Sequence, residues 1–134
     1  MPEASRPFMP GYDLPPPAIG ADTPRLLPWS WAAQRLVQAR NYWLATSQPD
    51  GRLHAMPVLG VWLDDSLVFS TSETSRKARN LARDPRCTIT TDVADEAVIV
   101  EGEASVLSLS ADAGLLQRWV AEYQSKYDWE MDPA

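Results

Sequence analysis

Hydrophobic residues follow a helical spacing near the two ends of the chain and alternate with polar residues over most of the stretch between them. The helical spacing predicts one helix over residues 30–40, with Ser30 as its N-cap, and a last helix over residues 111–126. The alternating stretches predict five strands, at residues 41–47, 52–63, 66–71, 86–92 and 97–107. A short helix over residues 75–83, stopped by Pro85, is predicted between the third and fourth strands.

Two polar segments predict the turns that join the first strands. Gln48-Pro49-Asp50-Gly51 has Pro and Gly where tight turns favour them, so the strands on either side form a hairpin. Asp64-Asp65 makes the next turn. Several short strands remove their exposed edges most simply when the sheet closes on itself. The sequence therefore predicts a mainly β fold with helices, in the form of a small antiparallel β-barrel.

The predicted strand at residues 52–63 has apolar residues on both of its faces. One face carries Leu53, Ala55, Pro57, Leu59, Val61 and Leu63, and the other carries His54, Met56, Val58, Gly60 and Trp62. This pattern predicts that both faces are largely buried. Pro57 cannot donate a hydrogen bond to a neighbouring strand, so it marks an edge, a bulge or a place where the sheet opens. Gly60 permits close approach of another backbone or a ligand.

Prolines divide the chain into an arm and a domain. Residues 1–28 carry eight of the twelve prolines, a density that prevents helix and disfavours strand pairing. This Pro-rich N-terminal arm is either extended across the domain or a partner subunit, or disordered. Residues 29–134 form the one domain that we expect, because a chain of 134 residues closes a single core.

Composition excludes several classes of function. A formal net charge of −6 argues against a nucleic-acid surface, which needs a broad positive face. Cys87 is the only cysteine, so an intrachain disulfide and a paired-thiol metal site are both excluded, and no histidine and carboxylate spacing predicts a metal site. The sequence has no apolar run long enough to span a bilayer and no signal peptide. We therefore expect a cytoplasmic protein that does not bind membranes.

Positive charge is concentrated in residues 70–85, against the overall sign of the chain. Ser and Thr residues at the start of this segment can cap the predicted helix, and Arg76 and Lys77 follow in its first turn. An isolated basic pair is usually a solvated helix face. Here five basic residues lie between Arg76 and Arg86, beside the exposed amides of a helix start, which favours an anion such as phosphate.

Several linked motifs resemble those of the pyridoxamine 5′-phosphate oxidase-like, FMN-binding split-barrel family. The resemblance covers residues 29–107. The matching segments, in the family's order and spacing, are Tyr42-Trp43-Leu44-Ala45-Thr46, Pro49-Asp50-Gly51-Arg52, His54-Ala55-Met56-Pro57-Val58, Phe69-Ser70-Thr71 and Ser75-Arg76-Lys77-Ala78-Arg79-Asn80-Leu81. The run Lys77-x-Arg79-Asn80-Leu81 with Asp84-Pro85-Arg86 is similar to the flavin- and deazaflavin-dependent oxidoreductases within that family.

The resemblance implies a split-barrel homodimer that binds FMN or the deazaflavin F420 in grooves between its subunits. Such an enzyme passes a hydride between the cofactor and a small organic substrate, and it needs no catalytic acid–base pair. No catalytic residue is therefore assigned. Ten residues match the cofactor-binding positions: Ser70, Thr71, Ser75, Arg76 and Lys77 toward the phosphate, His54, Met56, Pro57 and Val58 along the ring system, and Asn80 in the same groove.

Other readings stay open at this stage. The chain ends at Ala134 without the Arg and His segment with which vitamin B6 oxidases bind their substrate, so we expect a different substrate. The Lys-x-Arg-Asn-Leu pattern favours F420 slightly over FMN. The alternatives are a non-enzymatic protein that binds a flavin or haem on the same fold, and an inactive structural partner. His54 is the only histidine, and a lone histidine on a strand is more often structural than catalytic.

Overall fold

The structure is a computed structural model, and it describes residues 27–127. The predicted arm therefore lies outside the described residues, apart from Leu27 and Pro28. In chain order the elements are α1 (Trp29–Gln38), β1 (Tyr42–Ser47), β2 (Leu53–Val58), β3 (Val61–Leu63), β4 (Ser66–Val68), α2 (Arg76–Arg83), β5 (Arg86–Thr91), the 3-10 turn η1 (Ala94–Glu96), β6 (Ile99–Glu103) and α3 (Ala113–Tyr127). Within this part of the chain, no helix combines the length and the apolar character that crossing a membrane requires.

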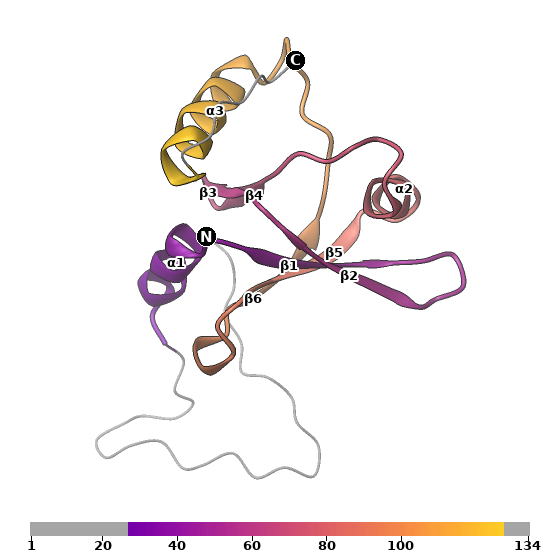
Figure 1. The fold of residues 1–134 in the computed structure, drawn as a ribbon, viewed down its shortest axis with the longest axis horizontal. Helices are drawn as coiled ribbons and strands as arrows, with labels where there is room; N and C mark the ends of the chain where they lie inside the picture. The colour runs from indigo at the N-terminus through magenta and orange to yellow at the C-terminus, as the bar shows by residue number, and fades with distance from the viewer. Residues whose placement is uncertain (1–26, 128–134) are drawn as a thin grey trace, which may run out of the picture.

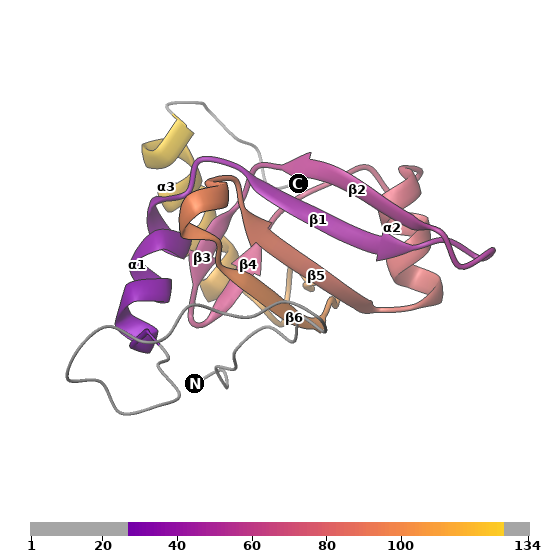
Figure 2. The same cartoon turned by 90° about the horizontal axis from the view of Figure 1, so that it is seen from below.

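The strands form two antiparallel sheets (Figures 1 and 2). The larger sheet has the order β2-β1-β5-β6, and β3 and β4 form a separate hairpin. Helices α1 and α3 lie toward one end of the larger sheet, and α2 lies at the other end. The predicted mixture of antiparallel strands and helices is confirmed, with the difference that the described strands are divided between two sheets.

The larger sheet has one buried face, here called the inner face, which carries Tyr42, Leu44 and Thr46 of β1. Each of these three side chains is at most 1% exposed. Tyr42 and Leu44 pack in a cluster with Leu36 of α1 and Trp62 of β3. A second cluster joins α3 to the small hairpin, and within it the indole N–H of Trp119 donates to the carbonyl of Val68 at 3.0 Å. The hairpin is therefore held between the sheet and α3.

The predicted strand at residues 52–63 is in fact two strands, and Gly60 lies at the break. The Gly60 carbonyl accepts a hydrogen bond from Nζ of Lys126 at 2.8 Å, and its N–H donates to the hydroxyl of Tyr127 at 3.0 Å. Because α3 takes up both backbone groups of Gly60, no neighbouring strand can pair with them. The chain therefore leaves the large sheet after β2 and enters the small one at β3.

The prediction that both faces of this stretch are buried is wrong for β2. This strand is an edge of the sheet, and Leu53 on one face and Met56 on the other are 74% and 41% exposed. Its last residue, Val58, is buried. The pattern suggested more burial than the chain provides, because no described element packs over most of β2.

Helix and strand ends also differ from the prediction. Helix α1 begins at Trp29 with Pro28 in the N-cap position, so Ser30 lies inside the helix and is not its cap. Strand β4 ends at Val68, three residues early, because the chain then turns toward the start of α2. Helix α3 begins later than predicted, after a turn in which the Ser108 N–H donates to the Asp112 carboxylate at 2.7 Å.

The predicted turns are confirmed. Gly51 has a φ of +87°, a conformation that favours glycine, and its N–H donates to the Gln48 carbonyl at 2.9 Å. Asp64 and Asp65 both have positive φ, as the two central residues of a tight hairpin turn require. The two turns fix which strands are neighbours.

Replacing Gly60 by alanine is expected to destabilise the fold. A Cβ there would lie 2.8 Å from Cδ1 of Leu67 and 3.1 Å from the backbone oxygen of Val68, and the backbone cannot easily move because α3 holds it. We expect Gly60→Ala to lower the free energy of unfolding by about 1–3 kcal/mol, as overpacking typically does. Gly102→Ala is the control, since nothing lies within 4 Å of its added Cβ. Equal stability of the two variants in urea denaturation would contradict this interpretation.

Candidate functional site

The start of α2 has the predicted cap. Ser75 has extended backbone angles, and its Oγ accepts a hydrogen bond from the N–H of Ala78 at 3.2 Å. Oγ1 of Thr71 lies 3.0 Å from the same oxygen, so the loop before the helix is joined to the cap. Ser70 precedes this loop and is exposed. Three of the predicted phosphate-side residues thus lie around, or lead into, one helix start.

The first turn of α2 carries positive charge that nothing in the helix balances. Arg76 and Lys77 occupy it, and it contains no acidic residue. Nη1 of Arg76 donates to the side-chain oxygen of Gln48 at 3.2 Å, which is a neutral partner. For the side chain of Lys77 no hydrogen bond is found within residues 27–127. Cations at a helix start are unfavourable, because this end of the helix dipole is already positive. A bound anion would relieve both charges.

Asn80 attaches this helix to the sheet. It is the one buried residue of α2, with 3% of its surface exposed. Its side-chain amide donates to Oγ1 of Thr46 at 3.0 Å. Thr46 is directly opposite His54 in the pairing of β1 with β2. A buried hydrogen bond therefore joins the cationic helix to the inner face of β1, the neighbour of the strand β2 that carries the predicted ring-binding residues.

The inner face is open at β2. His54 and Met56 lie there, opposite Thr46 and Leu44, and Met56 is 41% exposed whereas Leu44 is 1% exposed. Nδ1 of His54 is buried, and it has no hydrogen-bond partner in the described part of the chain. A buried polar atom without a partner is costly, so this nitrogen can receive a ligand group. The position offers an apolar surface with one unused polar atom.

Pro57 and Val58 do not lie on the open part of the inner face, where His54 and Met56 lie. Pro57 pairs with Trp43 on the opposite face, here called the outer face, and Val58 is buried in the core. The structure therefore places Asn80 against Thr46, the strand partner of His54, and Met56 follows on the same face of β2. The role of Pro57 and Val58 along a ring stays a prediction.

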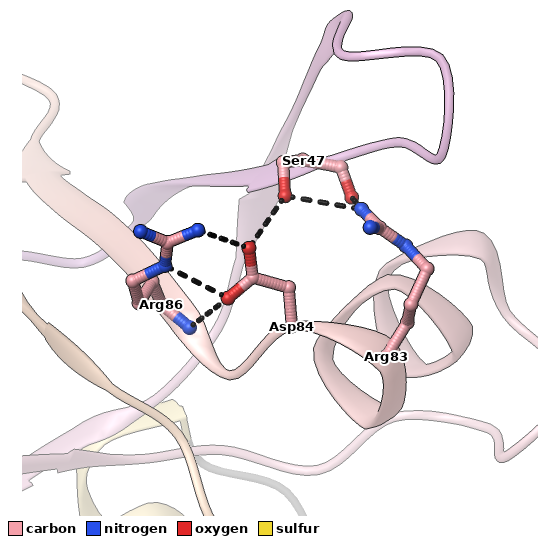
Figure 3. A network of polar contacts seen from close by, with 4 residues as sticks. All are labelled: Ser47, Arg83, Asp84 and Arg86. Atoms are coloured by element: carbon pink, nitrogen blue, oxygen red, sulfur yellow. Dashed lines mark hydrogen bonds and ion pairs between the residues drawn. The ribbon is translucent and has the colours of Figure 1, made fainter.

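The far end of α2 is fixed by a polar network that the sequence analysis did not identify (Figure 3). Arg86 donates to both carboxylate oxygens of Asp84, at 3.0 and 2.8 Å, and Nη2 of Arg83 donates to the Ser47 carbonyl at 2.7 Å. Oγ of Ser47 lies 3.4 Å from the Asp84 carboxylate. The hydrogen bonds from Arg86 hold the pKa of Asp84 well below its usual range. Arg83 and Arg86 thus make contacts within the protein that fix this end of α2.

Thr46 and Gln48 are further residues that sequence reasoning missed. Thr46 alone was detectable, since it is a polar residue on the otherwise apolar inner face of β1. Gln48 was assigned only to a turn. Its contact with Arg76 joins residues 28 positions apart, and no local pattern predicts that distance.

Comparisons with known proteins assign the chain to a family. A family model described as pyridoxamine 5′-phosphate oxidase matches residues 32–134, which is most of the chain. No curated protein matches. The family that the sequence motifs indicated is therefore confirmed.

Solved structures share the fold. A conserved hypothetical protein from Mycobacterium tuberculosis is 24% identical, with a TM-score of 0.68, over 83% of this chain and 71% of that one. A protein described as an F420 reductase is 18% identical, with a TM-score of 0.56, over 74% and 79% of the two chains. An FMN-binding protein from Nostoc punctiforme, described as related to pyridoxamine 5′-phosphate oxidase, is 27% identical, with a TM-score of 0.52, over 75% and 58%.

The Asp84 network predicts a dependence of stability on pH. Since the pKa of this carboxyl is lower in the folded state, its ionised form stabilises the fold above the unfolded pKa of about 4. As the pH falls below that value the unfolded state takes up the proton first, and the contribution is progressively lost. We expect Asp84→Asn to be less stable than wild type at neutral pH, with a difference that shrinks at acid pH.

Urea denaturation at several pH values measures this difference. Asp95→Asn is the control for the loss of one negative charge, because Asp95 is exposed and forms no ion pair with any described residue. A difference between wild type and Asp84→Asn that stayed constant from neutral to acid pH would show that the ionised network contributes nothing.

Proposed function

Because the chain belongs to the pyridoxamine 5′-phosphate oxidase family, we propose that it is an oxidoreductase that transfers a hydride between FMN or F420 and a small organic substrate. The observation that carries the proposal is the hydrogen bond between Asn80 and Thr46. It holds α2, whose start is capped and cationic, against β1, the strand beside the open stretch of β2. FMN and F420 each combine a phosphate with a flat ring system, the two features that these surfaces would bind.

The residues at the start of α2 would hold the phosphate. Arg76 and Lys77 supply charge, and the hydroxyls of Ser70, Thr71 and Ser75 supply shorter hydrogen bonds. This assignment is supported by the unbalanced charge of the first helical turn and by its free backbone amides. The phosphate would neutralise two cations that now lie at the wrong end of a helix dipole.

The inner face of β2 would receive the ring. The exposed Met56 gives an apolar contact, and Nδ1 of His54 gives one hydrogen-bonding atom. Asn80 is already bonded to Thr46, so its part is to position the helix against the ring site. The bound cofactor supplies the atom that accepts or donates the hydride. The protein would orient the ring, exclude water and hold the substrate beside it, tasks that need no general base.

We also propose that the molecule is a homodimer built on a split barrel, to which its two sheets both contribute. The outer face of the larger sheet supports this, because it carries exposed apolar residues that include Trp43, Leu53 and Ile99, which are 46%, 74% and 59% exposed. Such a surface is typical of a subunit interface. A second copy there would cover the strand β2, which the isolated chain leaves exposed.

A charge on the outer face is expected to break this dimer. Trp43→Glu would place a carboxylate in the centre of the proposed interface, so sedimentation should give a dimer for wild type and a monomer for the variant. Val106→Glu, at a 98% exposed residue in the connection before α3, is the control and should stay dimeric. A monomeric wild-type protein at micromolar concentration would contradict the proposed dimer.

Cofactor titration tests the proposed function directly. We expect purified protein to quench or shift the fluorescence of F420, and of FMN more weakly, with micromolar affinity. Tight binding of haem alone, with a Soret band lost in His54→Ala, would favour instead a haem-binding protein. A stable dimer that binds none of the three would indicate a structural partner, and either result would overturn the proposed activity.

The phosphate assignment predicts the effect of one substitution. Lys77→Ala should weaken cofactor binding by about 1.5–3 kcal/mol, roughly ten- to a hundredfold, as expected for the loss of a hydrogen bond to a charged group. Its thermal stability should be unchanged, because no described residue accepts a hydrogen bond from this side chain. Arg118→Ala removes a positive charge from α3, and it should bind like wild type. Equal affinity of Lys77→Ala and wild type for the cofactor would show that the phosphate does not bind at the start of this helix.

A further inference from the structure

A cleft with four charged residues at its rim lies at the end of the sheet opposite α2. It has a volume of about 220 Å³ and is formed by the last residues of α1 and by the segment that joins β5 to β6. Figure 2 shows α1 and η1 side by side there, while α2 lies at the other end of the sheet. The cleft is smaller than the roughly 300–1,000 Å³ of typical sites for drug-sized ligands, so it suits a small molecule. None of the residues assigned to the cofactor lines it.

Arg35 forms one wall of the cleft and is held rigidly. Its guanidinium lies 3.9 Å from the centre of the Trp31 ring, Nη1 donates to the Trp31 carbonyl at 3.3 Å, and Nη2 donates to Glu96 at 3.2 Å. The remaining donor, Nε, is buried and has no partner within residues 27–127. A fixed guanidinium with an unused N–H is arranged to bind a further acceptor.

Arg40 and Asp92 also line the cleft, and they do not pair with each other. The Arg40 guanidinium lies over the Tyr127 ring, 5.4 Å from its centre, and for this group no acceptor is found in the described part of the chain. Lys126 lies on the same ring at 5.3 Å, and burial, with a smaller contribution from the charge of Arg40, lowers its pKa to about 8. Arg40 therefore has no counter-ion in the described part of the chain, whereas Arg35 is paired with Glu96.

Arg40 and Asp92 thus leave one charge of each sign without an ion pair within residues 27–127, in a small cleft that also holds the Arg35–Glu96 pair. A simple anion would meet Asp92 and Glu96, and a simple cation would meet Arg35 and Arg40. A molecule that carries both charges avoids both conflicts. We propose that this cleft binds a small zwitterion of the amino-acid class, whose carboxylate accepts hydrogen bonds from Arg40 and from Nε of Arg35, and whose ammonium donates to Asp92 and Glu96.

NMR titration of the full chain tests the site. The probes are glycine, L-alanine and γ-aminobutyrate, which differ in the separation of their charges, together with acetate and methylammonium, which carry one charge each. We expect at least one zwitterion to shift the backbone amides of Ala39, Thr91 and Val93, with millimolar affinity. Acetate and methylammonium should bind at least tenfold more weakly. The titration needs no cofactor, so its result is separate from that of the proposed function.

Two exposed residues provide variants that should fold normally. Arg40→Gln and Asp92→Asn should each weaken the zwitterion at least tenfold. Arg118→Gln and Asp95→Asn are the controls for lost charge, since neither residue lines the cleft, and both should bind like wild type. Three results would each overturn the proposal: no shift with any zwitterion at tens of millimolar, acetate binding as tightly as the zwitterions, or binding that Asp92→Asn strengthens.

Discussion

The buried hydrogen bond from Asn80 to Thr46 is the contact on which the candidate cofactor site depends. Helix α2 is strongly polar, and Asn80 is its one buried residue, so little apolar surface holds this helix to the sheet. A buried amide without its partner costs about 1–3 kcal/mol, which makes other positions of the helix unfavourable. The network around Asp84 fixes the opposite end of the same helix. The helix, with its cationic start, is thereby held in a fixed position against β1.

A second constraint leaves β2 open. Both backbone groups of Gly60 are bonded to the end of α3, which separates β2 from β3 and makes β2 an edge strand. His54 and Met56 consequently keep an inner face that no described element covers fully. The two constraints concern neighbouring strands. One holds the cationic helix α2 against β1, and the other leaves the adjacent strand β2 as an exposed edge. Both constraints are hydrogen bonds within the fold.

The features that could be predicted from the sequence are those that depend on residues close together in the chain. The capped start of α2 at Ser75, the turn at Gly51 and the hairpin of β1 with β2 all follow from such short-range contacts. Asn80 was picked out by family resemblance, but its partner lies 34 positions away and no local pattern indicates it. The break at Gly60 depends on α3, more than sixty positions away. Burial of β2 was overestimated because an edge strand can carry the same alternation as a covered one.

The central claim is that one ligand spans the start of α2 and the inner face of β2. Backbone and side-chain NMR during titration with FMN or F420 measures this directly. We expect the amides of residues 75–78 and the side chains of His54 and Met56 to shift together, with one dissociation constant. Shifts confined to the helix, with β2 unchanged at saturation, would show an anion site without a ring site and would contradict it.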